Sequence, residues 1–368
     1  MIRLFILTVV LSFSVGIAKN NQAVMLVELS GRGIDSTSAQ ILTDKLRSEI
    51  IKVGKIPLVE RDKLLTVLKE QGLQQTGITN QDNIIKIGNI LNANRAIVGE
   101  VGKLNGLDFI AIRLLDIQTG KNIVSFDKTY NDFSEFLKIG ISELAKDISL
   151  SPKDWATLGD NKYEMNDFQS AITNYEIAMA YIANTDNSIY LESCSKDPFC
   201  SYSDSYSRMC RNLADSYSKI GKTDDAIMIL KKDIEQFPLG LLSYLMLGSI
   251  YFSQDRYLDA ESEYMAVVLL KKQYQNLHVY TAFYNAYFKL GLIHYWDDLA
   301  ENAVQDFTNA LTIRNDSETL LMRAKAYLKL NKKQLCISDL KKCVLDTSST
   351  SASISLQAKN MLDSLNLK

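Results

Sequence analysis

The second half of the sequence holds a degenerate repeat in which small and aromatic residues recur in one order. A small residue of the second predicted helix in each copy falls at Ala171, Ala226, Ala260, Ala303 and Cys336. Successive positions are separated by 55, 34, 43 and 33 residues. Two spacings fit a common period and two contain insertions, so this half is built from about five copies of one unit.

The repeat resembles the tetratricopeptide repeat family, whose unit is a helix–turn–helix of about 34 residues. The resemblance implies an all-α solenoid over residues 154–346, because one helix pair cannot bury its apolar face alone. Solenoids of this kind mostly bind other proteins. The amphipathic segment 352–367 is expected to cap the last repeat, and folding back into the binding groove is the alternative.

In that family the first helix of each pair lines a concave groove. By this resemblance we expect a groove that is polar near its N-terminal end and apolar and aromatic toward its C-terminal end. The candidate partner-binding residues are Leu245, Phe252, Phe288, Leu292, Tyr295, Trp296, Leu321 and Leu328. Exposed apolar patches mark partner sites, and aromatic anchors suit an amphipathic helix or an extended peptide. Packing between repeats is the alternative interpretation of the same residues.

The first residues, 1–18, have the pattern of a secretory signal peptide. Arg3 supplies a positive start, residues 4–15 are almost entirely apolar, and Gly16-Ile17-Ala18 fits a cleavage site. The apolar stretch is shorter than the ~20 residues of a membrane span, so we expect cleavage and no integral membrane span afterwards. The residue directly after the leader is Lys19 and not a cysteine. We therefore expect an exported periplasmic protein without a lipid anchor, and association with the outer membrane stays open.

Residues 23–150 have a different pattern, with strand and helix signals in the order β-α-β-α-α-β-β-β-α. The expected strands are 23–29, 56–59, 96–104, 109–117 and 122–130. Asn105-Gly106 and Gln118-Thr119-Gly120 are turn signals between the last three. This order predicts an α+β domain with a mixed sheet covered by helices.

Four segments of this domain resemble the soluble domain of the curli-secretion channel (CsgG-like) family. They are Val27-Glu28-Leu29-Ser30-Gly31-Arg32-Gly33-Ile34, Ile41-Leu42-Thr43-Asp44-Lys45-Leu46-Arg47, Leu58-Val59-Glu60-Arg61 and Ile112-Arg113-Leu114-Leu115-Asp116-Ile117-Gln118-Thr119-Gly120. The resemblance implies an envelope domain that binds partners or self-associates. Pore-forming members carry extra membrane-spanning hairpins and a lipidated cysteine. The loops here are too short for two added strands of ~9–11 residues, so we do not expect a pore.

Composition and motifs argue against several classes of chemistry. The sequence has 41 Lys and Arg against 43 Asp and Glu, and no basic stripe, which argues against a nucleic-acid partner. With His278 and His294 as its two histidines, it has few candidates for a metal site or a histidine catalyst. Gly31-Arg32-Gly33 lacks both the third glycine of a dinucleotide fingerprint and a P-loop lysine, so we expect a turn that enters a helix. We expect no catalytic residues, cofactor or metal.

Four of the five cysteines fall into two groups, and Cys210 is the odd one out. Cys194 and Cys200 lie in an insertion around Pro198, where a loop disulfide and free thiols are both open. Cys336 and Cys343 lie on one predicted helix about 10 Å apart along its axis, which is too far for a mutual bridge. We expect these two residues to pack in the core.

A leader, two interaction-type modules and no catalytic constellation together favour a non-enzymatic adaptor of the bacterial cell envelope. Its partner would be an envelope protein or peptide held in the repeat groove, with self-association through the N-terminal domain as a further expectation. Two alternatives are an accessory subunit of an outer-membrane export or curli-like secretion assembly, and a contact regulator of a cell-wall enzyme.

Overall fold

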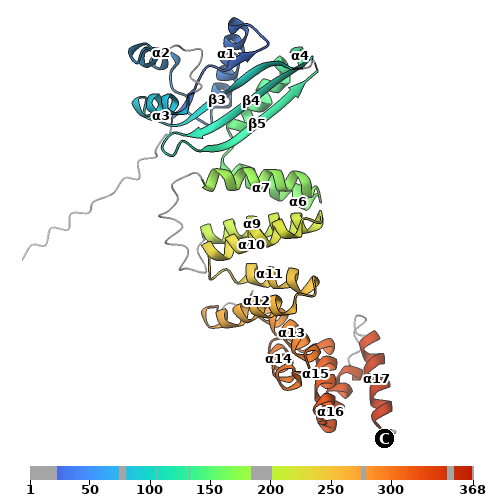
Figure 1. The fold of residues 1–368 in the computed structure, drawn as a ribbon. Helices are drawn as coiled ribbons and strands as arrows, with labels where there is room; N and C mark the ends of the chain where they lie inside the picture. Colours follow the sequence, from blue (N-terminus) through green and yellow to red (C-terminus); the bar gives the residue numbers. More distant parts are fainter. Residues whose placement is uncertain are drawn as a thin grey trace, which may run out of the picture. The chain divides into compact units, whose positions relative to one another are not determined.

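The computed structural model describes residues 23–73, 80–104, 106–131, 133–183, 201–274, 279–345 and 352–366 (Figure 1). Backbone contacts divide the protein into Met1–Asp154 with Ile177–Thr185, and Trp155–Glu176 with Asp186–Lys368. The expected leader 1–18 and the candidate disulfide between Cys194 and Cys200 lie outside the described residues. Among the helices of the described ranges, none combines the length and the apolar character that a membrane crossing requires.

The first unit is built on one mixed sheet, as expected. Its strands are β1 (Ala23–Leu26), β2 (Ser30–Arg32), β3 (Ala93–Leu104), β4 (Leu107–Asp116) and β5 (Asn122–Tyr130). The order is β1-β3-β4-β5, and β2 also pairs with β3. β1 and β2 run parallel to β3, whereas β3, β4 and β5 form antiparallel pairs. The three long strands match their predicted ranges to within three residues at each end.

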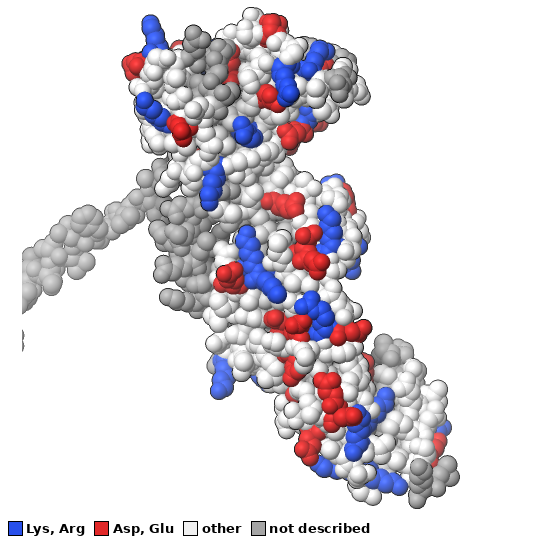
Figure 2. Space-filling view, in the orientation of Figure 1, with Lys and Arg blue, Asp and Glu red and all other residues white. Residues whose placement is uncertain are grey.

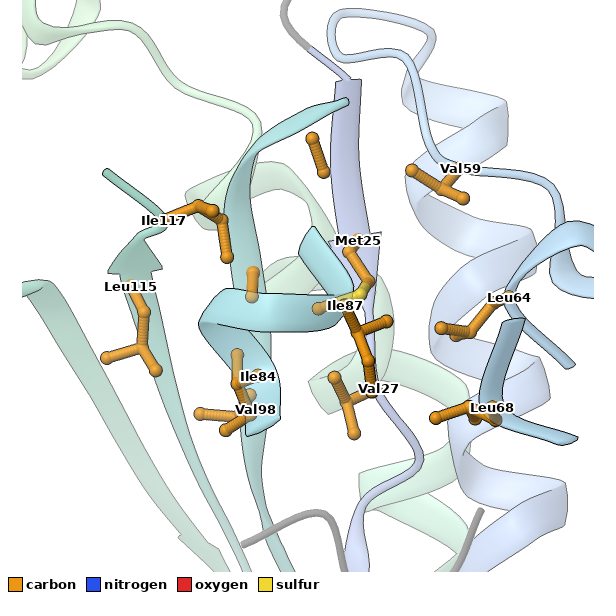
Figure 3. Packing of buried hydrophobic residues seen from close by; sticks show 12 residues of the cluster. Met25, Val27, Val59, Leu64, Leu68, Ile84, Ile87, Val98, Leu115 and Ile117 are labelled. Carbon is orange, nitrogen blue, oxygen red and sulfur yellow. The ribbon is translucent and has the colours of Figure 1, made fainter. Parts of the chain in front are cut away.

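Helices cover both faces of this sheet. The first three are α1 (Ser36–Val53), α2 (Arg61–Glu70) and α3 (Gln81–Ile90), and the sheet is followed by α4 (Phe133–Glu135), the π-helix η1 (Phe136–Gly140) and α5 (Ile141–Ile148). Helix α1 packs on α5 and β3. Side chains from α2 and α3 instead meet β1 and β3 in an apolar cluster that includes Met25, Leu68, Ile87 and Val98 (Figure 3).

Two details of the first unit differ from the predictions. The expected strand 56–59 is reduced to a single parallel bridge between Val24 and Leu58. Gly31 and Arg32, expected in a turn, belong to β2. This pairing depends on Gly102, because a Cβ there would lie 1.8 Å from the carbonyl oxygen of Arg32.

The second half of the protein is helical, and consecutive helices pack as pairs from α9 to α16 (Figure 1). The pairs are α6 (Pro152–Glu164) with α7 (Phe168–Ala183), α9 (Ser201–Lys219) with α10 (Thr223–Gln236), α11 (Leu241–Ser253) with α12 (Tyr257–Leu269), α13 (Tyr280–Trp296) with α14 (Ala300–Ile313), and α15 (Ser317–Lys329) with α16 (Lys333–Leu345). A 3₁₀ turn, η2 (Leu270–Gln273), follows α12. The expected α+β domain followed by an all-α repeat array is confirmed.

Each of these helix pairs turns through one residue in the left-handed region. These residues are Asn166, Gly221, Asp255, Asp298 and Asn331, with φ between 57° and 80°. Glycine, asparagine and aspartate adopt this conformation more readily than other residues do. Each lies five residues before the small residue that marks its repeat, so one turn geometry is used in all five copies.

The packing inside each pair explains the repeat signature. A glycine of the first helix faces an aromatic ring sixteen residues later: a Cβ on Gly159, Gly248 or Gly291 would lie 2.5, 2.9 or 2.6 Å from Tyr175, Tyr264 or Phe307. The second and fifth pairs have alanine and leucine at these positions, Ala214 with Leu230 and Ala324 with Leu340, all fully buried. An aromatic ring on the second helix is thus found with glycine on the first, and the smaller leucine is found with alanine.

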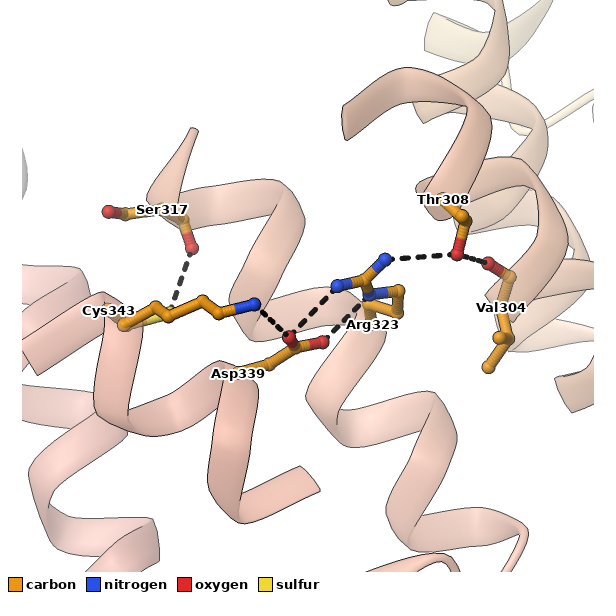
Figure 4. Close-up of polar contacts among 7 residues, drawn as sticks. Val304, Thr308, Ser317, Arg323, Asp339 and Cys343 are labelled. Carbon is orange, nitrogen blue, oxygen red and sulfur yellow. Dashed lines mark hydrogen bonds and ion pairs between the residues drawn. The ribbon is translucent and has the colours of Figure 1, made fainter. Parts of the chain in front are cut away.

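The C-terminal end of the array is closed by α17 (Ala352–Asn366). Its Ala358 is buried in one cluster with Leu321, Cys336 and Cys343, so both cysteines pack in the core and α17 covers the last helix pair. A buried ion pair joins α15 to α16, with Arg323 Nε 2.7 Å from Asp339 Oδ2 (Figure 4).

Candidate functional site

Three aromatic residues meet where the third and fourth repeats turn, and we call them the aromatic cluster: Phe252, Tyr257 and Trp296. Phe252 lies at the end of α11, Tyr257 begins α12 and Trp296 ends α13. The ring centroids are 5.6 Å apart for Phe252 and Trp296, 5.3 Å for Tyr257 and Trp296, and 5.6 Å for Phe252 and Tyr257. Trp296 is 47% exposed, which is high for so large an apolar residue.

A lysine extends this cluster. Lys289 lies on α13, two helical turns before Trp296 and therefore on the same side of the helix. Its Nζ is 4.0 Å from the ring centroid of Phe252, within the range of a cation–π contact. Partial burial lowers the pKa of Lys289 below its usual value, and the nearby carboxylate of Glu318 opposes this shift.

Other polar and charged groups around the cluster have partners within the protein. The Tyr257 hydroxyl donates to Asp255 at 2.6 Å. Arg256 pairs with Asp259 at 2.7 Å and lies 4.2 Å from the ring centroid of Tyr251. On the visible face of the repeat helices, positive and negative side chains are interspersed, without a field of one sign (Figure 2).

A hollow of about 510 Å³ lies next to the end of α13. It is lined by the turn residues Asp298 and Leu299, the first turn of α14, and Lys329 and Leu330 at the end of α15. Lys329 bonds to Asp298 and to the Tyr295 carbonyl oxygen, so its charge is already used inside the protein. The hollow therefore begins two residues after Trp296 in the sequence, and its lysine is already paired.

The eight predicted groove residues separate into two groups. Phe288, Leu292 and Tyr295 are half-buried against an inter-repeat cluster of Ala303, Phe307 and Ala326, which is the packing alternative. Leu321 is only 4% exposed and packs in the cluster with Ala358 of α17, which again fits the packing alternative. Of the other four, Leu245 and Phe252 are half-buried, and Trp296 and Leu328 are exposed.

The expected polar end of the array is used largely for contacts between helices. The Tyr163 hydroxyl donates to Asp215 at 2.7 Å, and the Tyr175 hydroxyl donates to Asp160 at 2.7 Å. Asn212 also donates to Asp160, at 3.0 Å. The bonds of Tyr163 and Asn212 connect the first and second repeats, and that of Tyr175 lies within the first, so we place no partner site on these carboxylates.

Two residues of the site were not among those predicted from the sequence. Tyr257 belongs to a second helix, whereas the prediction considered first helices only. Lys289 is polar and was not considered among apolar anchors, although its spacing of seven from Trp296 places both on one helix face. No group of three or more His, Cys, Asp or Glu suited to a metal is present in the described ranges.

Comparison with known proteins supports the repeat type directly for one helix pair. The tetratricopeptide repeat family matches residues 241–274, which span α11, α12 and η2. No curated protein sequence matches this one.

Three of the similar solved structures are those of MamA and LpoB. A structure of MamA protein is 20% identical, covering 52% of this protein and 88% of its own length, with a TM-score of 0.40. The LpoB C-terminal domain from Salmonella enterica is 21% identical, covering 30% and 83%, with a TM-score of 0.27. That from Escherichia coli is 18% identical, covering 30% and 84%, with a TM-score of 0.27. These likenesses are too low to transfer a function. The CsgG-like resemblance of the first unit stays a prediction.

Proposed function

We propose that this protein is a non-enzymatic adaptor whose repeat array binds a partner protein through the aromatic cluster. The observation that carries the proposal is a contiguous group of three aromatic rings, with Trp296 nearly half exposed, on repeats of tetratricopeptide type. Tryptophan and tyrosine are enriched among the residues that dominate binding at protein interfaces.

The physical basis is the burial of aromatic surface. A large aromatic residue buries about 150–250 Å² when it is fully covered, and apolar burial contributes about 25 cal/mol per Å². Part of the Trp296 surface stays in contact with water after folding. Docking of a partner residue buries this surface and so contributes favourable free energy to binding. Truncating an anchor of this kind typically weakens binding by about 2 kcal/mol or more.

The test uses crosslinking in cells that express the full-length protein, followed by identification of the captured proteins. We expect one dominant partner, whose yield falls strongly in Trp296→Ala. Leu258→Ala is the matched control, because Leu258 is 78% exposed on α12 and is not a member of the aromatic cluster. Capture that is equal in wild type and Trp296→Ala would remove the cluster as the binding site.

We further propose that the adaptor acts in the cell envelope after export. The leader pattern of residues 1–18 supports export, and the CsgG-like segments of the first unit support an envelope role that includes self-association. Cell fractionation checks the location, with the periplasmic fraction as the expected one. Light scattering over a wide concentration range checks self-association, and a mass that stays monomeric would argue against it.

A further inference from the structure

Lys289 places a positive charge at the edge of the aromatic cluster. Within the described ranges no carboxylate oxygen lies within 4.0 Å of its Nζ, and its close neighbour is the Phe252 ring at 4.0 Å. Three other cations of these repeats are paired: Arg256 with Asp259, Lys329 with Asp298, and Arg323 with Asp339. Glu318, whose carboxylate acts on Lys289 electrostatically, lies beyond this distance, so Lys289 differs from these three cations in having no ion-pair partner within 4.0 Å among the described residues.

Lys289 is also half-buried, and this partial removal from water lowers its pKa. A partner that covers the aromatic cluster removes more water from this ammonium group. A charge that becomes buried in an interface is strongly unfavourable unless a group of opposite sign accompanies it. The cluster therefore discriminates between partners by charge as well as by apolar fit.

We infer that the aromatic cluster receives a protein segment in which a bulky apolar residue lies close to a carboxylate, which pairs with Lys289. The apolar residue packs against Phe252, Tyr257 and Trp296, and the carboxylate belongs to Asp, Glu or the C-terminus of the segment. This inference rests on the proposed function, and it adds the chemistry of the partner. A basic segment bound at the same place would bring its positive charge next to that of Lys289, and the two would repel each other.

The experiment selects peptides from a displayed random library on the purified full-length protein and measures the binding of individual synthetic peptides. The expected peptides combine Trp, Phe or Leu with Asp, Glu or a free C-terminus. Amidating the peptide C-terminus distinguishes a terminal carboxylate from one of Asp or Glu.

Charge variants then test the pairing. Lys289→Glu should weaken binding of an acidic peptide at least about tenfold, and a Glu→Lys version of that peptide should regain affinity for this variant. Lys289→Met keeps the aliphatic stem over Phe252 and should also weaken binding, because the charge alone is lost. The matched control is Lys271→Met, which removes a lysine 5.2 Å from the Tyr287 ring and should leave binding unchanged.

Each outcome decides the inference. Peptides that bind in a Trp296-dependent way, with no preference for acidic residues and no response to Lys289→Glu, would overturn the inference and leave the proposed function standing. If no selected peptide depends on Trp296, both fail. If Lys289→Glu changes the mass of the protein in light scattering, the occupant is a second copy, and the inference is wrong. Circular dichroism confirms that each variant is folded.

Discussion

In each repeat a small residue of the first helix is paired with a large residue of the second. This steric match can be tested by giving the fourth repeat the alanine and leucine that the second and fifth repeats have. In the fourth repeat, a Cβ on Gly291 would lie 2.6 Å from Phe307 Cε1 and 2.7 Å from Cδ1, and Phe307 is fully buried. The alanine would have to displace this ring or shift α13 away from α14. The second and fifth repeats already accommodate alanine with leucine.

The expected magnitudes follow from packing and helix propensity. Overpacking a core costs about 1–3 kcal/mol, and replacing glycine in a helix interior regains about 1 kcal/mol, so Gly291→Ala should destabilise by about 1 kcal/mol. Phe307→Leu removes buried atoms and should cost about 1–2 kcal/mol, less than the roughly 3–5 kcal/mol of a change to alanine. In the double variant the smaller leucine leaves room for the new methyl group. We expect a favourable coupling of about 1 kcal/mol.

The assay is urea unfolding of the full-length protein for wild type, both single variants and the double variant. Gly248→Ala serves as a matched comparison, because its nearest ring atom, on Tyr264, is 2.9 Å away, and it should destabilise less than Gly291→Ala. A coupling energy within about 0.3 kcal/mol of zero would refute the steric explanation of the repeat signature.

Three further predictions concern the rest of the array. Asp339→Ala leaves Arg323 buried without its partner, so we expect about 3–5 kcal/mol of destabilisation in urea unfolding, and less when Arg323→Met is added. Burial raises the pKa of Asp233, so the folded carboxyl holds its proton to higher pH than the unfolded one, and stability falls as pH rises from about 4. Asp233→Asn removes this loss. The urea midpoint of the variant minus that of wild type should therefore increase as the pH rises from about 4 to about 7. Deleting residues 352–366 uncovers the cluster around Leu321, and limited proteolysis should then cleave α16 faster.

The repeat architecture was predictable because its signature has a local steric cause. A glycine or alanine on one helix and its larger partner sixteen residues later are parts of one helix pair, so their spacing is the same wherever the pair occurs. The turn residues add a second local signal, since Asn, Asp or Gly stands at each left-handed position. Insertions between pairs changed the period without hiding either signal.

The short strands of the first unit could not be predicted in the same way. β2 has three residues, two of which, Gly31 and Arg32, were expected in a turn. It forms because Gly102 on a distant strand allows close backbone approach, and sequence windows do not contain that information. The expected strand at 56–59 similarly depended on a neighbour, and it reaches only one bridge at Leu58.

The candidate site was predicted in part, for a related reason. Helical periodicity identifies the face of α13 or α15 but not how the next repeat covers it. Phe288 is therefore packed against α14, and Leu321 is covered by the cluster that includes Ala358 of α17. Trp296 extends beyond this packing because it ends its helix. Lys289 acquires its role from the Phe252 ring of the preceding repeat, a contact that only the folded array shows.

The most direct test of the account compares the proteins crosslinked in cells to wild type, Trp296→Asp and Leu258→Asp. Both substitutions place a charge on an exposed apolar residue, so both alter the surface in a similar chemical way. We predict one dominant partner that is retained by wild type and Leu258→Asp and lost by Trp296→Asp. The same set of captured proteins in all three would contradict an adaptor that acts through the aromatic cluster.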